Sequence, residues 1–135
     1  MKRWWIYVKE RFPPFTYLIL TLGISLSGAA ITKPPISPFS IALSTIGFFL
    51  FFGNLRLMDE RKDFEKDRLA HPERPLPRGL LSLSEVDRML GALLGVMIAF
   101  GVLIYFFGGP NVSILYLFIT FYRFQWTNSH FRKYC

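Results

Sequence analysis

Long apolar stretches alternate with short polar segments along this chain of 135 residues. Residues 15–31, 41–58 and 89–107 contain a single charged residue among them, Arg56, and a fourth apolar stretch begins at residue 112. A helix needs about 20 apolar residues to cross a bilayer, and 18 residues in an α-helix rise by roughly 27 Å. The pattern predicts an all-α integral membrane protein with about four transmembrane helices.

The fourth apolar stretch ends early, because Arg123 and several polar residues follow within a dozen positions. We interpret residues 127–135 as a tail that fits neither a membrane span nor a loop, which is typical of a chain that is cut or read out of frame. No internal repeat or linker divides residues 1–135, so we expect one domain or part of one.

The acids of the chain gather directly after the second apolar stretch, and no proline separates the two. The helix is therefore predicted to continue through residue 67. Since an α-helix turns by about 100° per residue, Asp59, Asp63, Asp67 and Glu60 fall at roughly 0°, 40°, 80° and 100° of its circumference, and Arg56 falls at roughly 60°. Four carboxylates and one guanidinium thus share one face of the helix.

Two interpretations of this acidic face are open. Like charges one turn apart repel, so a bound cation is one explanation, and ligands that offer only oxygen favour a hard ion such as Mg²⁺. The alternative is a solvated helix held by ion pairs between Asp59 and Lys62 and between Asp63 and Lys66. The position of Arg56 within the apolar stretch favours a site for a charged ligand, because a charge at membrane depth is costly.

A loop framed by prolines follows the acidic segment. Pro72, Pro75, Pro77 and Gly79 exclude a regular helix, and the loop presents three arginines: Arg68, Arg74 and Arg78. Ser82 and Glu85 then form the S-x-x-E pattern of a capping box, which predicts the start of the next helix.

Composition and charge support the membrane assignment. Hydrophobic residues make up 52% of the chain, and the net charge is +7. Of the sixteen basic residues, four lie before the first apolar stretch, one lies after it, eight lie between residues 56 and 88, and three lie near the end. This alternation of basic-rich and basic-poor segments is the pattern of the positive-inside rule. We therefore expect a multi-pass protein in the plasma membrane of a prokaryote, with its N-terminus and residues 59–88 in the cytoplasm. A topology rule already explains the charge, so nucleic acid is not an expected partner.

Acids that bind Mg²⁺ and arginines fixed in a nearby loop are together the two parts of a diphosphate site. Mg²⁺ takes a few carboxylates together with phosphate oxygens, and the planar guanidinium of arginine matches phosphate geometry. An isoprenoid diphosphate suits this location, because its hydrocarbon tail can lie among apolar helices while its diphosphate head stays at the polar end of these helices. Cleavage of its carbon–oxygen bond requires stabilisation of the leaving diphosphate.

The motifs resemble those of the UbiA-type intramembrane prenyltransferases, whose first aspartate-rich motif reads N-D-x-x-D-x-x-x-D and precedes an R-P-L-x-x-G loop. Here Asp59 stands for the asparagine, Glu60 for the first aspartate, and Asp63 and Asp67 follow at the family spacing. Residues 74–79 complete the loop motif. The two substitutions keep oxygen ligands.

The resemblance implies a Mg²⁺-dependent transfer of a prenyl group from a polyprenyl diphosphate to a hydrophobic acceptor, such as an aromatic ring or a lipid precursor. It implies that Asp59, Glu60, Asp63 and Asp67 bind the metal. We expect Arg56, Arg74 and Arg78 to contact the diphosphate, and no residue is assigned to the chemical step itself.

The family fold has nine helices, and the resemblance covers about the first four. Its second aspartate-rich motif has no counterpart in this sequence, so we expect the chain to be inactive by itself. The alternative from another class is a small non-enzymatic membrane protein whose cytoplasmic helix binds a partner protein or lipid headgroups.

Overall fold

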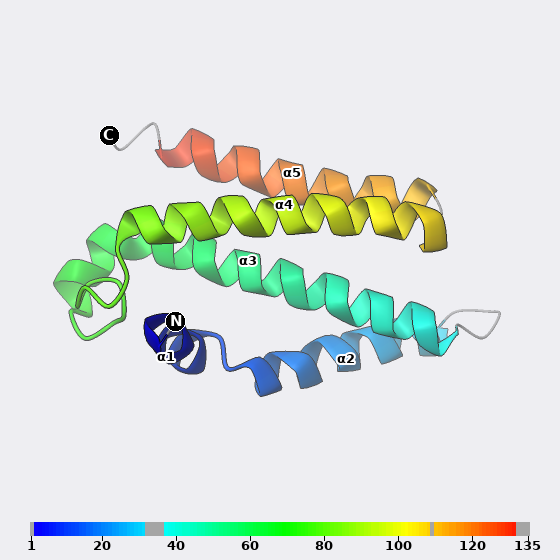
Figure 1. The fold of residues 1–135 in the computed structure, drawn as a ribbon, viewed down its shortest axis with the longest axis horizontal. Helices are drawn as coiled ribbons and strands as arrows, with labels where there is room; N and C mark the ends of the chain where they lie inside the picture. Colours follow the sequence, from blue (N-terminus) through cyan, green and yellow to red (C-terminus); the bar gives the residue numbers. More distant parts are fainter. Residues whose placement is uncertain (1, 32–36, 109, 132–135) are drawn as a thin grey trace.

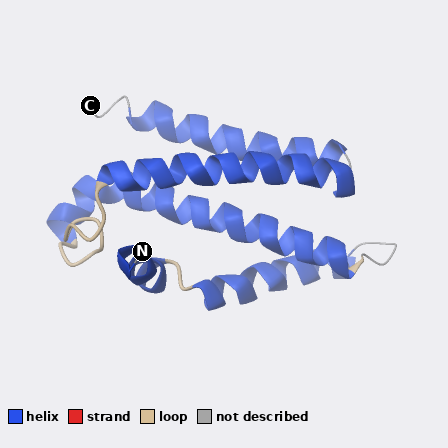
Figure 2. Ribbon diagram, in the orientation of Figure 1, coloured by secondary structure: helices blue, strands red, loops and turns tan. Residues whose placement is uncertain are grey.

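The computed structural model describes the backbone of residues 2–31, 37–108 and 110–131. Within these ranges the chain is helical and contains no strand (Figure 2). The helices are α1 (Lys2–Arg11), α2 (Pro14–Ile31), α3 (Pro38–Ala70), α4 (Leu83–Gly108) and α5 (Pro110–Phe131). In this part of the chain three helices, α2, α3 and α4, are long and apolar enough to cross a membrane. The predicted all-α class is confirmed.

Some predictions fall wholly or partly outside these ranges. Residues 132–135 of the predicted tail lie outside the described residues, as do residues 32–36 after the first apolar stretch and Gly109 after the third. The backbone of α5 is helical as far as Phe131. Among the residues whose side chains are described, its apolar part is Val112–Tyr122.

Helices α2 to α5 lie side by side in chain order, as Figure 1 shows. Helix α3 packs against both α2 and α4, and α4 packs against α5. The short helix α1 is seen nearly end-on in Figure 1, so it runs across the others at the end where the loop between α3 and α4 lies. This end of the bundle carries the polar residues discussed below.

Helix α3 is the longest element, with 33 residues, which corresponds to about 50 Å. It begins at Ser37, whose side chain accepts a hydrogen bond from the backbone N–H of Ser40 at 3.1 Å, and Pro38 occupies the first turn. A bilayer core takes up about 30 Å of a helix, so roughly 20 Å of α3 extends beyond it. The acidic segment lies in this extension, and its predicted helical continuation is confirmed.

The loop between α3 and α4 is packed against the bundle rather than extended into solvent. Pro75, Leu76 and Leu81 are buried, and Gly79 adopts the left-handed conformation with φ of 77°, which glycine adopts without steric cost. Leu76 and Leu81 form a core cluster with Tyr7 of α1, Leu57 of α3 and Val86 of α4. One small apolar cluster thus joins the loop to three helices.

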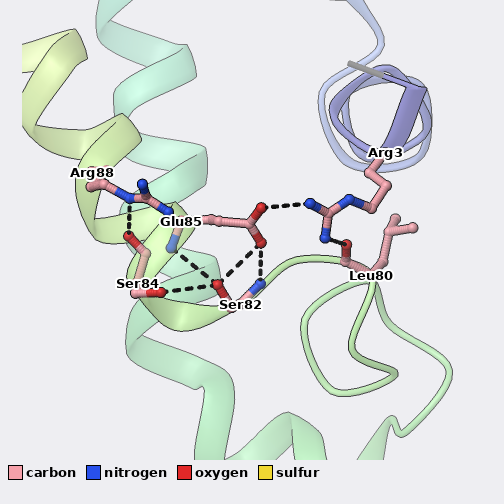
Figure 3. Close-up of polar contacts among 6 residues, drawn as sticks. All are labelled: Arg3, Leu80, Ser82, Ser84, Glu85 and Arg88. Atoms are coloured by element: carbon pink, nitrogen blue, oxygen red, sulfur yellow. Dashed lines mark hydrogen bonds and ion pairs between the residues drawn. The ribbon is translucent and has the colours of Figure 1, made fainter.

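Helix α4 begins with the predicted capping box. The Glu85 carboxylate accepts from the backbone N–H of Ser82 at 2.9 Å, and the Ser82 hydroxyl accepts from the backbone N–H of Glu85 at 3.2 Å. Arg3 of α1 donates to the same carboxylate at 2.8 Å and to the carbonyl of Leu80 (Figure 3). The start of α4 therefore also anchors α1.

Helices α4 and α5 approach closely at Gly101. The hydroxyl of Ser113 donates to the Gly101 carbonyl at 2.7 Å, and a Cβ atom at Gly101 would lie 2.5 Å from the Leu117 side chain. In contrast, a Cβ atom at Gly91 meets no atom within 4 Å. Gly101 and Gly91 thus provide a crowded position and an open one on the same helix.

We predict that Gly101→Ala lowers the free energy of unfolding by about 1–3 kcal/mol, because an inserted methyl group forces Leu117 and α5 outward. Gly91→Ala is the matched control, and it is expected to be neutral or to stabilise the helix by roughly 0.5–1 kcal/mol. Titration of the protein in micelles with a denaturing detergent, followed by circular dichroism, measures both. Equal stability of the two variants would contradict the close α4–α5 packing.

Candidate functional site

A polar pocket of about 240 Å³ opens where α1, α3 and the α3–α4 loop meet. Its lining consists of three arginines and four acids: Arg11, Arg56, Arg74, Asp59, Glu60, Asp63 and Asp67. All four acids predicted from the sequence and two of the three predicted arginines, Arg56 and Arg74, are therefore brought together in one site.

Glu60 is the most deeply buried acid of the pocket, with its side chain 1% exposed. Its Oε1 accepts from Nε of Arg11 and lies 3.2 Å from Nη2 of Arg56, one helical turn away on α3. Its Oε2 is also buried and has no hydrogen-bond partner among the described residues. A buried carboxylate oxygen without a partner is costly, so this oxygen is a candidate ligand position of the site.

Asp67 lies two turns further along α3 and is also buried. Its Oδ1 accepts from Nη1 of Arg74 in the loop. This hydrogen bond raises the pKa of the Arg74 guanidinium above its usual value, so Arg74 is a permanent cation here. Because the loop is packed and Pro75 is buried beside it, Arg74 is held in position before any ligand arrives.

The burial of the acids follows their order around the helix. Asp59 is exposed, Asp63 is half-buried, and Asp67 and Glu60 are buried, in the same sequence as their predicted angles of roughly 0°, 40°, 80° and 100°. The 80–100° side of the arc therefore faces the interior of the molecule, and the 0° side faces out.

Arg78, the third predicted diphosphate contact, does not line the pocket. Its guanidinium pairs with Glu10 of α1 at 3.0 and 3.1 Å and donates to the carbonyl of Glu73. Its contact with Glu10 instead holds α1 against the loop. Arg68, also in this region, is exposed at the end of α3.

One site residue was not expected from the sequence. Arg11 lines the pocket and pairs with Glu60, and Tyr7, one turn earlier on α1, lies in the core cluster. Burial raises the pKa of the Tyr7 hydroxyl above its usual range, and the negative charge of Glu60 raises it further, so Tyr7 remains a neutral proton donor. The positive-inside rule already explains the basic residues of the N-terminal segment. The sequence therefore offers no reason to assign Arg11 to the site.

The carboxylates do not form a closed metal cage. Within the described ranges, no group of three or more His, Cys, Asp or Glu side chains could hold a metal ion. The helix places the acids on one arc, but it also separates Asp59 from Asp67 by about 12 Å along its axis. The Glu60 carboxylate points toward α1, where it pairs with Arg11, and the Asp67 carboxylate points toward the loop, where it pairs with Arg74.

These residues still fit a metal ion that arrives with a phosphate ligand. Mg²⁺ in phosphate-transfer sites is bound by one or two carboxylates, by water and by phosphate oxygens rather than by an all-protein cage. The free Oε2 of Glu60 and the half-buried carboxylate of Asp63 offer such a partial set.

No family model, no curated protein and no solved structure matches this chain.

We predict that Arg11→Ala lowers the free energy of unfolding by about 2–3 kcal/mol, because the buried Glu60 keeps only Arg56 as its partner. Arg3→Ala is the matched control on the same helix. The Arg3 side chain is 59% exposed, so its removal is expected to change stability much less. Detergent titration followed by circular dichroism measures both variants.

The double variant with Arg11→Ala and Glu60→Gln should recover much of the lost stability, because it removes the uncompensated charge. If both single arginine variants destabilise the protein equally, the Arg11–Glu60 contact is not the interaction that fixes α1.

Proposed function

We propose that the polar pocket binds the diphosphate head of an isoprenoid diphosphate together with Mg²⁺, and that the chain is the N-terminal portion of a UbiA-type prenyltransferase. Two lines of argument support this proposal. One is the aspartate-rich motif followed by the R-P-L-x-x-G loop in the sequence. The other is the pocket, in which both motifs contribute side chains.

The observation that carries the proposal is the Glu60 carboxylate. It stands at the first aspartate position of the motif, it is buried, and one of its oxygens lacks a hydrogen-bond partner within the described part of the chain. A purely structural ion pair in such a place is expected to satisfy both oxygens. A ligand position left open at the motif residue favours binding over a structural role.

The charges of the pocket favour a complex of cation and anion over a free anion. Its three arginines and four acids leave a formal charge of −1, so a free diphosphate meets net repulsion. With one Mg²⁺ bound, the formal charge of the site becomes +1, and the guanidinium groups of Arg11, Arg56 and Arg74 can turn from carboxylate to phosphate oxygens. Mg²⁺ would also stabilise the negative charge that develops on the leaving diphosphate.

The proposal places the acidic end of α3 at the cytoplasmic face of a membrane. Three apolar helices of the described residues can span it, and the basic residues of α1 and of the loop lie at the same end of the bundle, as the positive-inside rule requires of a cytoplasmic face. Helix α5 is proposed as the fourth span. The acceptor remains a hydrophobic molecule of unassigned class.

A non-enzymatic membrane protein is the competing function. The observation in its favour is that each of the two buried acids is paired with an arginine, Glu60 with Arg11 and Asp67 with Arg74. In that case the network only fixes α1 and the loop, and it has no affinity for Mg²⁺ or diphosphate.

We predict that the chain in micelles binds inorganic pyrophosphate in the presence of Mg²⁺ and not in the presence of EDTA, as measured by isothermal titration calorimetry. Asp63→Asn should weaken this binding by about tenfold to a hundredfold, because it removes one charged ligand. Asp63 takes no part in the ion pairs that hold α1 and the loop, so the fold should be retained.

Glu65→Gln is the matched control, since it removes one negative charge from the same helix at an exposed position outside the pocket. Its affinity for pyrophosphate should equal that of the unmodified chain. Binding that is unaffected by EDTA, or that falls equally in the two variants, would show a general charge effect and favour the competing function.

A further inference from the structure

One side of α1 is exposed. At about 100° per residue, Trp5, Lys9, Lys2 and Ile6 fall at roughly 300°, 340°, 0° and 40° of the helix circumference. All four residues are exposed, with exposed fractions of 56% for Trp5 and 41% for Ile6. We call these four residues the outer face of α1. Two cations and two large apolar side chains therefore share one arc of roughly 100°.

The opposite side of α1 packs against the rest of the molecule. Tyr7 is buried in the core cluster, Trp4 and Val8 pack against that cluster, and Arg11 lines the polar pocket. These four residues fall between roughly 140° and 240° of the same circumference. The outer face and the polar pocket thus lie on opposite sides of one short helix, so a ligand of the outer face does not compete for the pocket.

The charged residues that flank the outer face already have partners. Arg3 pairs with Glu85 of α4 at 2.8 Å (Figure 3). Glu10, the one acid of α1, pairs with Arg78 of the loop at 3.0 Å. Both contacts hold α1 in place, and they engage the carboxylate that lies nearest along the helix to the outer face.

The two lysines of the outer face, in contrast, form no ion pair with an acid among the residues that the structure describes. Nζ of Lys9 lies 5.2 Å from the centroid of the Trp5 ring, a cation–π contact that holds the cation beside the apolar part of the face. Together Lys2 and Lys9 give the outer face a formal charge of +2. The face is therefore suited to a ligand with both a negative charge and an apolar part.

The position of α1 places the outer face at the level of lipid headgroups. Helix α1 ends two residues before α2, which begins at Pro14 and is long and apolar enough to cross a membrane. The 18 residues of α2 rise by about 27 Å, close to the hydrocarbon thickness of about 30 Å, so Pro14 stands near the boundary of the hydrocarbon core. Because α1 runs across the other helices (Figure 1), its outer face lies at this one depth.

The side chains of the outer face match an anionic phospholipid. Helices that lie in the membrane interface combine basic residues with Trp and aliphatic side chains, and the apolar side chains enter the boundary of the acyl chains. Each lysine near a negatively charged membrane surface contributes about fivefold in affinity. A zwitterionic headgroup has no net charge, so the outer face is expected to distinguish lipids by their charge.

Two other occupants match the outer face less well. A stable interface with a folded protein takes about 20 to 30 residues on each side, far more than these four side chains provide. A soluble anion would contact the two lysines and leave Trp5 and Ile6 without a partner. An amphiphile uses all four side chains.

We propose that the outer face of α1 binds anionic phospholipid headgroups in the leaflet at this end of the bundle. Lys2 and Lys9 contact the phosphate oxygens, and Trp5 and Ile6 lie against the first segment of the acyl chains. This inference is independent of the proposed function, because it requires neither Mg²⁺ nor a diphosphate.

The test adds phosphatidylglycerol or phosphatidylcholine with identical acyl chains to the chain in micelles, and native mass spectrometry counts the lipids bound to each chain. Phosphatidylglycerol is expected to bind more tightly by about tenfold to thirtyfold, since two lysines contribute about fivefold each. Equal affinity for the two lipids overturns the inference.

The double variant with Lys2→Gln and Lys9→Gln should lose this preference and keep its affinity for phosphatidylcholine, whereas arginine at both positions should retain the preference. The matched control combines Lys66→Gln and Arg68→Gln, which remove the same charge from two exposed positions on α3, and it should retain the preference as well. Circular dichroism checks the fold of each variant. A preference that survives in the Lys2 and Lys9 glutamine variant, or that falls equally in the control, overturns the inference.

Inorganic phosphate and Trp5→Ala distinguish a lipid from a free anion. Excess inorganic phosphate should leave phosphatidylglycerol bound, because phosphate lacks the apolar part. Trp5→Ala should lower the affinity for both lipids by about tenfold, because it removes an apolar contact. Full displacement of phosphatidylglycerol by inorganic phosphate, or unchanged lipid affinity in Trp5→Ala, would identify a site for soluble anions and overturns the lipid assignment.

Discussion

The buried carboxylate of Glu60 is the constraint on which the rest of this structure depends. A charge with a 1% exposed side chain needs cations within contact distance, and they come from Arg56 on the same helix and Arg11 on α1. The partner on α1 can only be in place if that short helix lies across the bundle. The position of α1 then fixes Phe12, which follows it, against Phe49 of α3, and it fixes Tyr7 in the core cluster.

Much of the fold follows from local sequence patterns. Apolar stretches of sufficient length, Ser82 and Glu85 at the start of α4, and the lack of a proline before residue 67 predict elements that depend only on neighbouring residues. The order of burial from Asp59 to Glu60 also follows from helical geometry alone. The acids and the loop arginine Arg74 could therefore be assigned to one site without knowledge of tertiary contacts.

What the sequence does not predict are the contacts between distant segments. Arg11 and Glu60 are separated by 49 positions, and Arg78 and Glu10 by 68, and no periodicity links either pair. Arg78 was predicted to contact a diphosphate from its position in the loop alone. In the structure its guanidinium pairs instead with the Glu10 carboxylate of α1. The axial rise of the helix was also left out of the prediction. A helical-wheel projection places the acids on one arc but does not show the distance of about 12 Å along the axis between Asp59 and Asp67.

The ion pairs of the pocket and the proposed ligand site are not opposed interpretations, because the same groups serve both. In the absence of ligand the arginines pair with the two buried acids, Glu60 and Asp67, which makes their charges tolerable. A cation can take over the carboxylates while the phosphate takes over the guanidinium groups, so each charge exchanges one partner for another. Since the packed loop has already ordered Arg74, little further side-chain entropy is lost on binding. The oxygen of Glu60 that lacks a partner is the position at which this exchange can begin.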